Sequence, residues 1–186
     1  MVAFLLWILA PASARAQAYM TESGHAEFTS SVPLHTFTGT SDRLVGKIDL
    51  ADSTVDFYLD LETLETGIGK RDKDMRTTLE TDTYPFAEFF GTLVTPFDPD
   101  RRGPQPATVR GEFTLHGVTR SVEIDGTLET TDDGLQVEAA WDINIEDYDI
   151  EPPGLLIVRV DEVQRVRIEA LLEPITDSTA SSPPHP

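Results

Sequence analysis

The chain has 186 residues and 39% of them are hydrophobic, which is enough for one domain with a substantial core and excludes global disorder. It carries 33 acidic but only 14 basic residues, and the resulting net charge of −19 disfavours nucleic acid and anionic membrane surfaces as partners. The absence of cysteine excludes disulfides, thiolate metal sites, cysteine nucleophiles and a lipidated N-terminal cysteine. The acidity fits either a solubilising coat or adaptation to a salty habitat, and both interpretations stay open.

The first residues have the pattern of an export signal. An apolar run, Met1 to Ala10, precedes the small-x-small site Ala14-Arg15-Ala16. We therefore expect residues 1–16 to be removed and the mature chain, starting at Gln17, to be periplasmic or secreted, with no integral membrane span. No lysine or arginine precedes the apolar run, so a start codon further upstream and a retained anchor stay open.

From Gly24 onward the sequence alternates between apolar and polar residues with the period of two that is typical of β-strands. The predicted strands cover residues 26–30, 34–38, 44–48, 55–61, 87–93, 108–116, 119–130, 135–145 and 163–172. Turn residues separate them at 98–104, at Gly117-Val118 and at 132–134, and Pro152-Pro153-Gly154 interrupts the chain. This pattern predicts an all-β fold, an antiparallel barrel of about eight substantial strands over residues 17–175, followed by a disordered tail at 176–186.

One excursion interrupts the strands. The alternation stops at Thr66-Gly67-Ile68-Gly69, and the charged segment 70–76 that follows is typical of a short helix with few apolar residues. Proline disfavours helix at the residue before it, so Tyr84-Pro85 ends this segment, and the next strand begins at once. We expect the helical excursion to cross one end of the barrel.

Two segments carry a resemblance to a known family. Thr66-Gly67, Arg71-Asp72, Met75-Arg76, Tyr84-Pro85 and Phe89 form the first, and 111–120 (Gly-Glu-Phe-Thr-Leu-His-Gly-Val-Thr-Arg) forms the second, with Phe113 in place of a leucine. Together they resemble the signatures of the YceI-like family, over roughly residues 24–173. The resemblance implies a lipocalin-like barrel, usually secreted by bacteria, that binds polyisoprenoid lipids.

The sequence offers little for catalysis or metal binding. Its histidines, at positions 25, 35, 116 and 185, are scattered, and it contains neither a Gly-x-Ser-x-Gly elbow nor a glycine-rich phosphate loop. Asp142, Glu146, Asp147 and Asp149 permit a paired-carboxylate hydrolase, but among 33 acidic residues such proximity is expected by chance. We therefore expect no catalytic residue, no metal, no cofactor and no enzymatic activity.

The inward faces of the predicted strands indicate a ligand cavity. Apolar wall is expected from Phe57, Leu59, Phe89, Phe113, Leu115, Trp141 and Ile143. Small residues fall on the same faces by parity, namely Gly91, Gly111, Ala139 and Ala170, and they would leave room for a ligand. The alternative is that the large side chains fill this space.

The helical excursion supplies the candidate headgroup residues, Arg71 and Arg76, because guanidinium donors suit a phosphate. The alternative is an ordinary helix pair between Asp72 and Arg76.

The sequence and the resemblance together predict a binding protein that holds a long isoprenoid lipid, of the polyprenyl phosphate or quinone type. The protein could also assemble as a homodimer. Two alternatives stay open, a filled structural or stress-response envelope barrel and an enzyme acting on a lipid or sugar.

Overall fold

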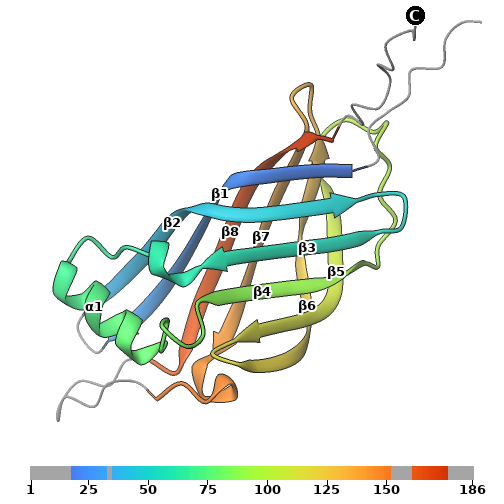
Figure 1. The fold of residues 1–186 in the computed structure, drawn as a ribbon. Coiled ribbons are helices and arrows are strands. Elements are labelled where there is room, and N and C mark those ends of the chain that lie inside the picture. Colours follow the sequence, from blue (N-terminus) through green and yellow to red (C-terminus); the bar gives the residue numbers. More distant parts are fainter. Residues whose placement is uncertain (1–17, 33–34, 152–160, 176–186) are drawn as a thin grey trace, which may run out of the picture.

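The computed structural model describes residues 18–32, 35–151 and 161–175, and within them it confirms the predicted barrel (Figure 1). Eight antiparallel strands close on themselves in sequence order, with β1 paired to both β2 and β8. The elements are β1 (Ala18–Val32), β2 (His35–Asp49), β3 (Thr54–Asp60), η1 (Leu61–Thr63), α1 (Gly69–Thr78), β4 (Phe86–Leu93), β5 (Gln105–Leu115), β6 (Val118–Thr130), β7 (Leu135–Asn144), η2 (Ile145–Tyr148) and β8 (Val163–Pro174).

Several predicted boundaries differ from the observed ones, and β1 begins at Ala18, eight residues before the predicted strand 26–30. Residues 35–38 and 44–48, predicted as parts of separate strands, belong to the single long strand β2, and residue 34 lies outside the described residues. The β5–β6 turn is His116-Gly117, one residue earlier than expected, and both residues have positive φ, 52° and 75°. Two consecutive positive φ angles are characteristic of the type I′ turn, whose twist matches that of the flanking strands. The predicted signal segment, the Pro152-Pro153-Gly154 break and the tail lie outside the described residues.

Alternation fixes which side chains face the interior. In β3, Val55, Phe57 and Leu59 are buried, whereas Asp56 and Tyr58 between them are exposed. The same alternation recurs along β4, β5 and β7. Since the sheet closes, one apolar face of every strand is removed from water without a second layer of structure.

One end of the barrel is filled by side chains. Leu135 and Leu172 pair across β7 and β8 and both are 0% exposed. Buried Tyr19 pairs with Ile48 at the same end. The buried Gln105 side chain donates to the Asp98 carbonyl at 2.7 Å and accepts from its N–H at 3.2 Å, so it ties down the β4–β5 loop. This end forms a solid core, close to where β1 begins and β8 ends.

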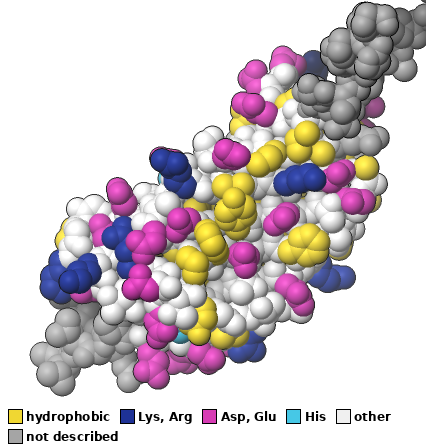
Figure 2. All heavy atoms as spheres, viewed as in Figure 1, with side chains coloured by type: hydrophobic (Ala, Val, Ile, Leu, Met, Phe, Trp, Pro, Cys, Tyr) yellow, Lys and Arg dark blue, Asp and Glu magenta, His cyan; other side chains and the backbone are white. Residues whose placement is uncertain are grey.

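The outer surface is not uniformly polar. Figure 2 shows hydrophobic side chains in a stripe between acidic ones on the face that β3 and β4 form. Phe90 is 60% exposed, and Tyr58 and Phe86 are in edge-to-face contact with 5.8 Å between ring centroids. No partner chain is part of the structure, and the homodimer stays a prediction.

Gly91 and Gly111 do not leave room for a ligand, contrary to expectation. They face each other across β4 and β5, where the two backbones approach closely. A Cβ atom on Gly111 would lie 2.3 Å from the Phe90 carbonyl oxygen, and one on Gly91 would lie 2.4 Å from that of Arg110. Glycine is needed at these positions for strand contact.

This close approach predicts that Gly111→Ala destabilises the barrel even though it adds only one methyl group. The strands must separate, at a cost of about 1–3 kcal/mol as for other overfilled sites, or about 3 °C in thermal midpoint per kcal/mol for a chain of this size. Thermal unfolding followed by circular dichroism measures it. Gly69→Ala is the matched control, since a Cβ there meets nothing within 4 Å; equal midpoints for both variants would contradict the account.

Candidate ligand cavity

A cavity of about 510 Å³ occupies the barrel interior between the filled end and α1. All eight strands contribute to its wall, and the lining is predominantly aliphatic and aromatic. A volume of this size lies within the range of roughly 300–1,000 Å³ that is typical of small-molecule sites. The barrel is therefore not filled by its own side chains along its whole length.

The predicted wall residues lie where the sequence placed them, with specific exceptions. The large side chains all line the cavity, as does Arg71: Phe57, Leu59, Phe89, Phe113, Leu115, Trp141 and Ile143. Ala139 also lines it, whereas Gly91, Gly111 and Arg76 do not. Whether these residues contact a ligand stays a prediction.

Two glycines that the sequence analysis did not single out help to shape the cavity. Gly39 pairs with Phe28, and Gly46 pairs with Phe57. A Cβ atom on Gly39 would lie 2.2 Å from the Phe28 ring, and one on Gly46 would lie 2.1 Å from the Phe57 ring. Each ring thus lies over a glycine on the neighbouring strand instead of projecting across the interior. The signal in the sequence is glycine at inward positions of β2, detectable only once the strand register is known.

The mouth of the cavity is covered by α1, which lies across the end of the barrel near η2 (Figure 1). Lys70, Arg71, Asp74 and Met75 of α1 line the cavity. Lys70 and Asp74 form an exposed i,i+4 ion pair at 2.6 Å. The Arg71 guanidinium lies 4.5 Å from the centre of the Phe37 ring, in a cation–π contact. The charged side chains that helix α1 contributes to the cavity lining therefore lie at the mouth of the cavity.

A compact polar cluster attaches the start of α1 to the preceding loop. Asp72 accepts hydrogen bonds from the Thr66 backbone N–H at 2.8 Å and from the Thr66 hydroxyl. Arg71 donates through Nε to the Thr66 hydroxyl at 2.8 Å and through Nη2 to the Thr66 carbonyl at 2.7 Å. Gly67, with φ 77°, provides the turn between the partners. Arg71 and Asp72 are adjacent in the helix and point in different directions. Both side chains nevertheless reach Thr66, because the loop folds back over the start of the helix.

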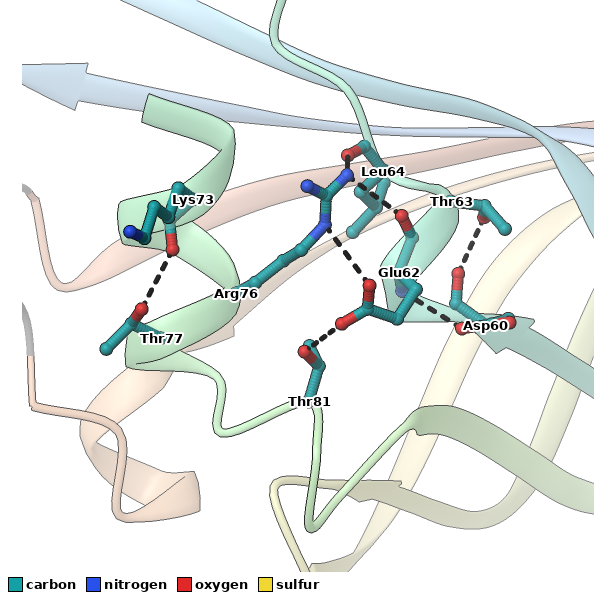
Figure 3. A network of polar contacts seen from close by, with 8 residues as sticks. All are labelled: Asp60, Glu62, Thr63, Leu64, Lys73, Arg76, Thr77 and Thr81. Carbon is teal, nitrogen blue, oxygen red and sulfur yellow. Dashed lines mark hydrogen bonds and ion pairs between the residues drawn. The ribbon is translucent and has the colours of Figure 1, made fainter. Parts of the chain in front are cut away.

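Arg76 has a structural position rather than one at the mouth (Figure 3). Its Nη2 donates to the carbonyls of Glu62 at 3.0 Å and Leu64 at 3.4 Å, and its Nε lies 3.7 Å from the Glu62 carboxylate. Glu62 also accepts from the Thr81 hydroxyl. The Glu62 side chain thus links η1 to α1 through Arg76 and to the loop after α1 through Thr81. Asp72 hydrogen-bonds to Thr66, not to Arg76, so the expected helix pair is not the contact that forms.

The two segments that carry the family resemblance meet beside the mouth. The rings of Tyr84 and His116 are 4.9 Å apart, and a Cβ on Gly117 would lie 2.5 Å from the Tyr84 ring. His116 Nδ1 is 3.1 Å from the Tyr148 carbonyl oxygen, which joins the β5–β6 turn to η2. Burial raises the pKa of Tyr148. These contacts give the segments a role in positioning the rim.

Within the described ranges, no group of three or more His, Cys, Asp or Glu side chains gathers in a way that could hold a metal ion. No described helix is long and apolar enough to cross a membrane. Of the four carboxylates considered for a hydrolase, Asp142 pairs with Arg165 at 3.0 Å, and the other three lie in or beside η2 and are exposed.

Comparison with known proteins decides the family. The model of the YceI-like domain matches residues 7–172. The chain belongs to the YceI-like family. No curated protein matches it.

Solved structures show the same fold as this YceI-like chain. A polyisoprenoid-binding domain from Saccharophagus degradans, implicated in plant cell wall breakdown, is similar with a TM-score of 0.73 and 21% identity, covering 87% of this chain and 100% of that one. BcnA from Burkholderia cenocepacia is similar with a TM-score of 0.65 and 13% identity, covering 78% and 94%. At these identities the likeness establishes the fold alone.

The Thr66 cluster generates a prediction about acid stability. Hydrogen bonds from the Thr66 hydroxyl and then from its backbone N–H lower the pKa of Asp72, against the opposing effect of burial. A lowered pKa stabilises the fold fully above the unfolded value of about 3.9 and loses this effect as the pH falls through the folded value. The stability difference between the parent and Asp72→Asn should therefore be largest near neutral pH and shrink below about pH 4.

Urea unfolding midpoints between neutral pH and pH 2.5 measure this difference. Asp52, whose pKa is also lowered, mainly by the Thr54 hydroxyl, is present in both proteins and cancels. Glu88→Gln, on the exposed face of β4, reports the general effect of removing one carboxylate. A constant difference between parent and Asp72→Asn across this range would refute the role of the cluster.

Proposed function

We propose that this YceI-like protein holds a long isoprenoid lipid, of the polyprenyl phosphate or quinone type, inside the barrel without reacting with it. The observation that carries the proposal is the apolar cavity of about 510 Å³, closed at one end by Leu135 and Leu172 and covered at the other by α1. The similar Saccharophagus degradans domain is a polyisoprenoid-binding domain, which supports the choice of ligand.

Affinity in this proposal comes from removing the ligand's hydrocarbon from water. Each buried methylene contributes roughly 0.8 kcal/mol, from which the ordering of the chain and the loss of translational freedom subtract. The aromatic and aliphatic wall needs no directed contact to obtain this energy. The lipid's headgroup would lie towards α1, where Arg71 faces the cavity.

The proposal includes an export step, periplasmic or secreted localisation and no enzymatic activity. The signal pattern before Gln17 supports the first two. The third rests on the predominantly apolar wall of the cavity, since a hydrolase needs converging acids and bases. A filled structural barrel is the second candidate, and the cavity is the observation against it.

Substitution at Ala139 tests whether the cavity holds lipid. Ala139 lines the cavity on β7, whereas the next residue, Ala140, points outward. Ala139→Leu should lower co-purified lipid and the affinity for added isoprenoid, with little loss of stability, because an open cavity accepts added volume. Ala140→Leu should change neither.

Lipid extraction with mass spectrometry and thermal unfolding are measured together on the parent and both variants. A filled barrel gives the opposite pair of results. It would contain no lipid, and Ala139→Leu would cost about 1–3 kcal/mol of stability by overfilling.

A further inference from the structure

We propose that the ligand carries an uncharged oxygen function, a hydroxyl or carbonyl, which binds inside the barrel at Ser30, Gln164 and Trp141; the inference rests on the proposed function. Ser30 is 0% exposed and lines the cavity, yet its hydroxyl has no hydrogen-bond partner in the part of the chain that the structure describes. The Trp141 indole nitrogen is likewise buried and unpartnered there.

Unpaired buried polar groups are costly and rare enough in folded proteins to require a reason. Two of them occur here on a wall whose other members are almost all apolar. Serine gains nothing at such a position from filling space, since alanine fills it nearly as well. A ligand atom that accepts the hydroxyl hydrogen would remove the cost and explain the residue.

Strand register places these groups in one sector of the wall. Thr29 pairs with Arg165, so Ser30 and Gln164 are the next positions along β1 and β8. Gln164 pairs with Ile143 on β7, two residues beyond Trp141. Neighbouring strands are about 4.8 Å apart, so Ser30 and Gln164 can reach one small polar group. Trp141 lies on β7 diagonally from Gln164, and its ring packs edge-to-face on Phe113 of β5, with 6.0 Å between the ring centroids.

The chemistry of the sector matches an uncharged oxygen. Ser30 and Trp141 can donate, and Gln164 already donates its Nε2 to the Asp161 carbonyl at 2.5 Å. That bond uses the amide nitrogen, so Oε1 is the atom that Gln164 can offer as an acceptor. A hydroxyl can use both a donor and an acceptor, and a carbonyl can use the donors.

A phosphate does not fit this sector. A buried phosphate needs a cation, because an unpaired charge away from water is far more costly than an unpaired hydroxyl. The cations that line the cavity are Lys70 and Arg71 of α1. Lys70 pairs with Asp74, and Arg71 directs Nε and Nη2 to Thr66. The sector therefore selects an isoprenoid alcohol or carbonyl compound over a phosphate ester.

Three probes that share one isoprenoid chain separate these possibilities: geranylgeraniol, geranylgeranyl phosphate and an isoprenoid hydrocarbon of matching length. Binding is measured by the fluorescence of Trp141 in the chain that begins at Gln17, since the full sequence contains only two tryptophans and Trp7 lies in the predicted signal segment. We expect Ser30→Ala to weaken the alcohol about tenfold, equivalent to about 1.4 kcal/mol, and to leave the hydrocarbon unchanged. Ser31→Ala, the neighbouring residue on the opposite face, is the control.

Thermal unfolding of the ligand-free proteins adds a second readout. Ser30→Ala removes an unpaired buried hydroxyl, so its midpoint should equal or exceed that of the parent. Equal affinity of parent and Ser30→Ala for the alcohol, or tighter binding of the phosphate than of the alcohol, would overturn this inference while leaving the proposed function intact. Failure of all three probes to bind the parent would overturn both.

Discussion

Closure of eight antiparallel strands into a cylinder is the constraint on which the rest of this structure depends. It pairs β1 with β8, so both edges of the sheet are satisfied, and it commits every second residue of each strand to the interior. An eight-stranded barrel has an interior that side chains can just fill or that can hold one small ligand. The choice between these outcomes therefore depends on individual inward residues.

This chain adopts both outcomes, one at each end. At the end where the chain termini of the barrel meet, Tyr19, Leu135 and Leu172 fill the interior and supply a solid core. Towards α1 the rings of Phe28 and Phe57 lie against glycines of β2, and the centre stays open. The solid end stabilises the fold, so the open end can remain empty without collapse.

The helix that covers the mouth is held by a different kind of interaction from the one that holds the barrel together. Helix α1 is almost all polar and buries only Asp72, so hydrophobic burial contributes little to its position. Polar contacts replace it: Arg71 and Asp72 converge on Thr66, and Arg76 reaches the carbonyls of η1 and the residue after it. A cover held by a few hydrogen bonds is easier to displace than one held by a core. This property suits the proposed uptake of a long lipid.

The sequence predicted the barrel and most of its wall because strand alternation is a local property with a fixed period. Phe57, Phe113 and Trp141 face inward for that reason alone. Gly91 and Gly111 were misinterpreted because parity shows which way a residue points but not how closely two backbones approach. Arg76 was misplaced because its partners, the carbonyls of Glu62 and Leu64, come from a loop whose path has no sequence pattern. Ser30 lies in the predicted strand 26–30, but the sequence gives no sign of its role, since an unpaired hydroxyl becomes visible only when its surroundings are known.

Uptake of an isoprenoid chain by the apolar cavity can be measured by calorimetric titration with geranylgeraniol at several temperatures. Burial of apolar surface on binding produces a negative heat-capacity change, whatever the sign of the enthalpy at any one temperature. The account predicts saturable binding of one ligand per chain with a clearly negative heat-capacity change. Absence of binding, or binding whose enthalpy does not vary with temperature, would contradict it.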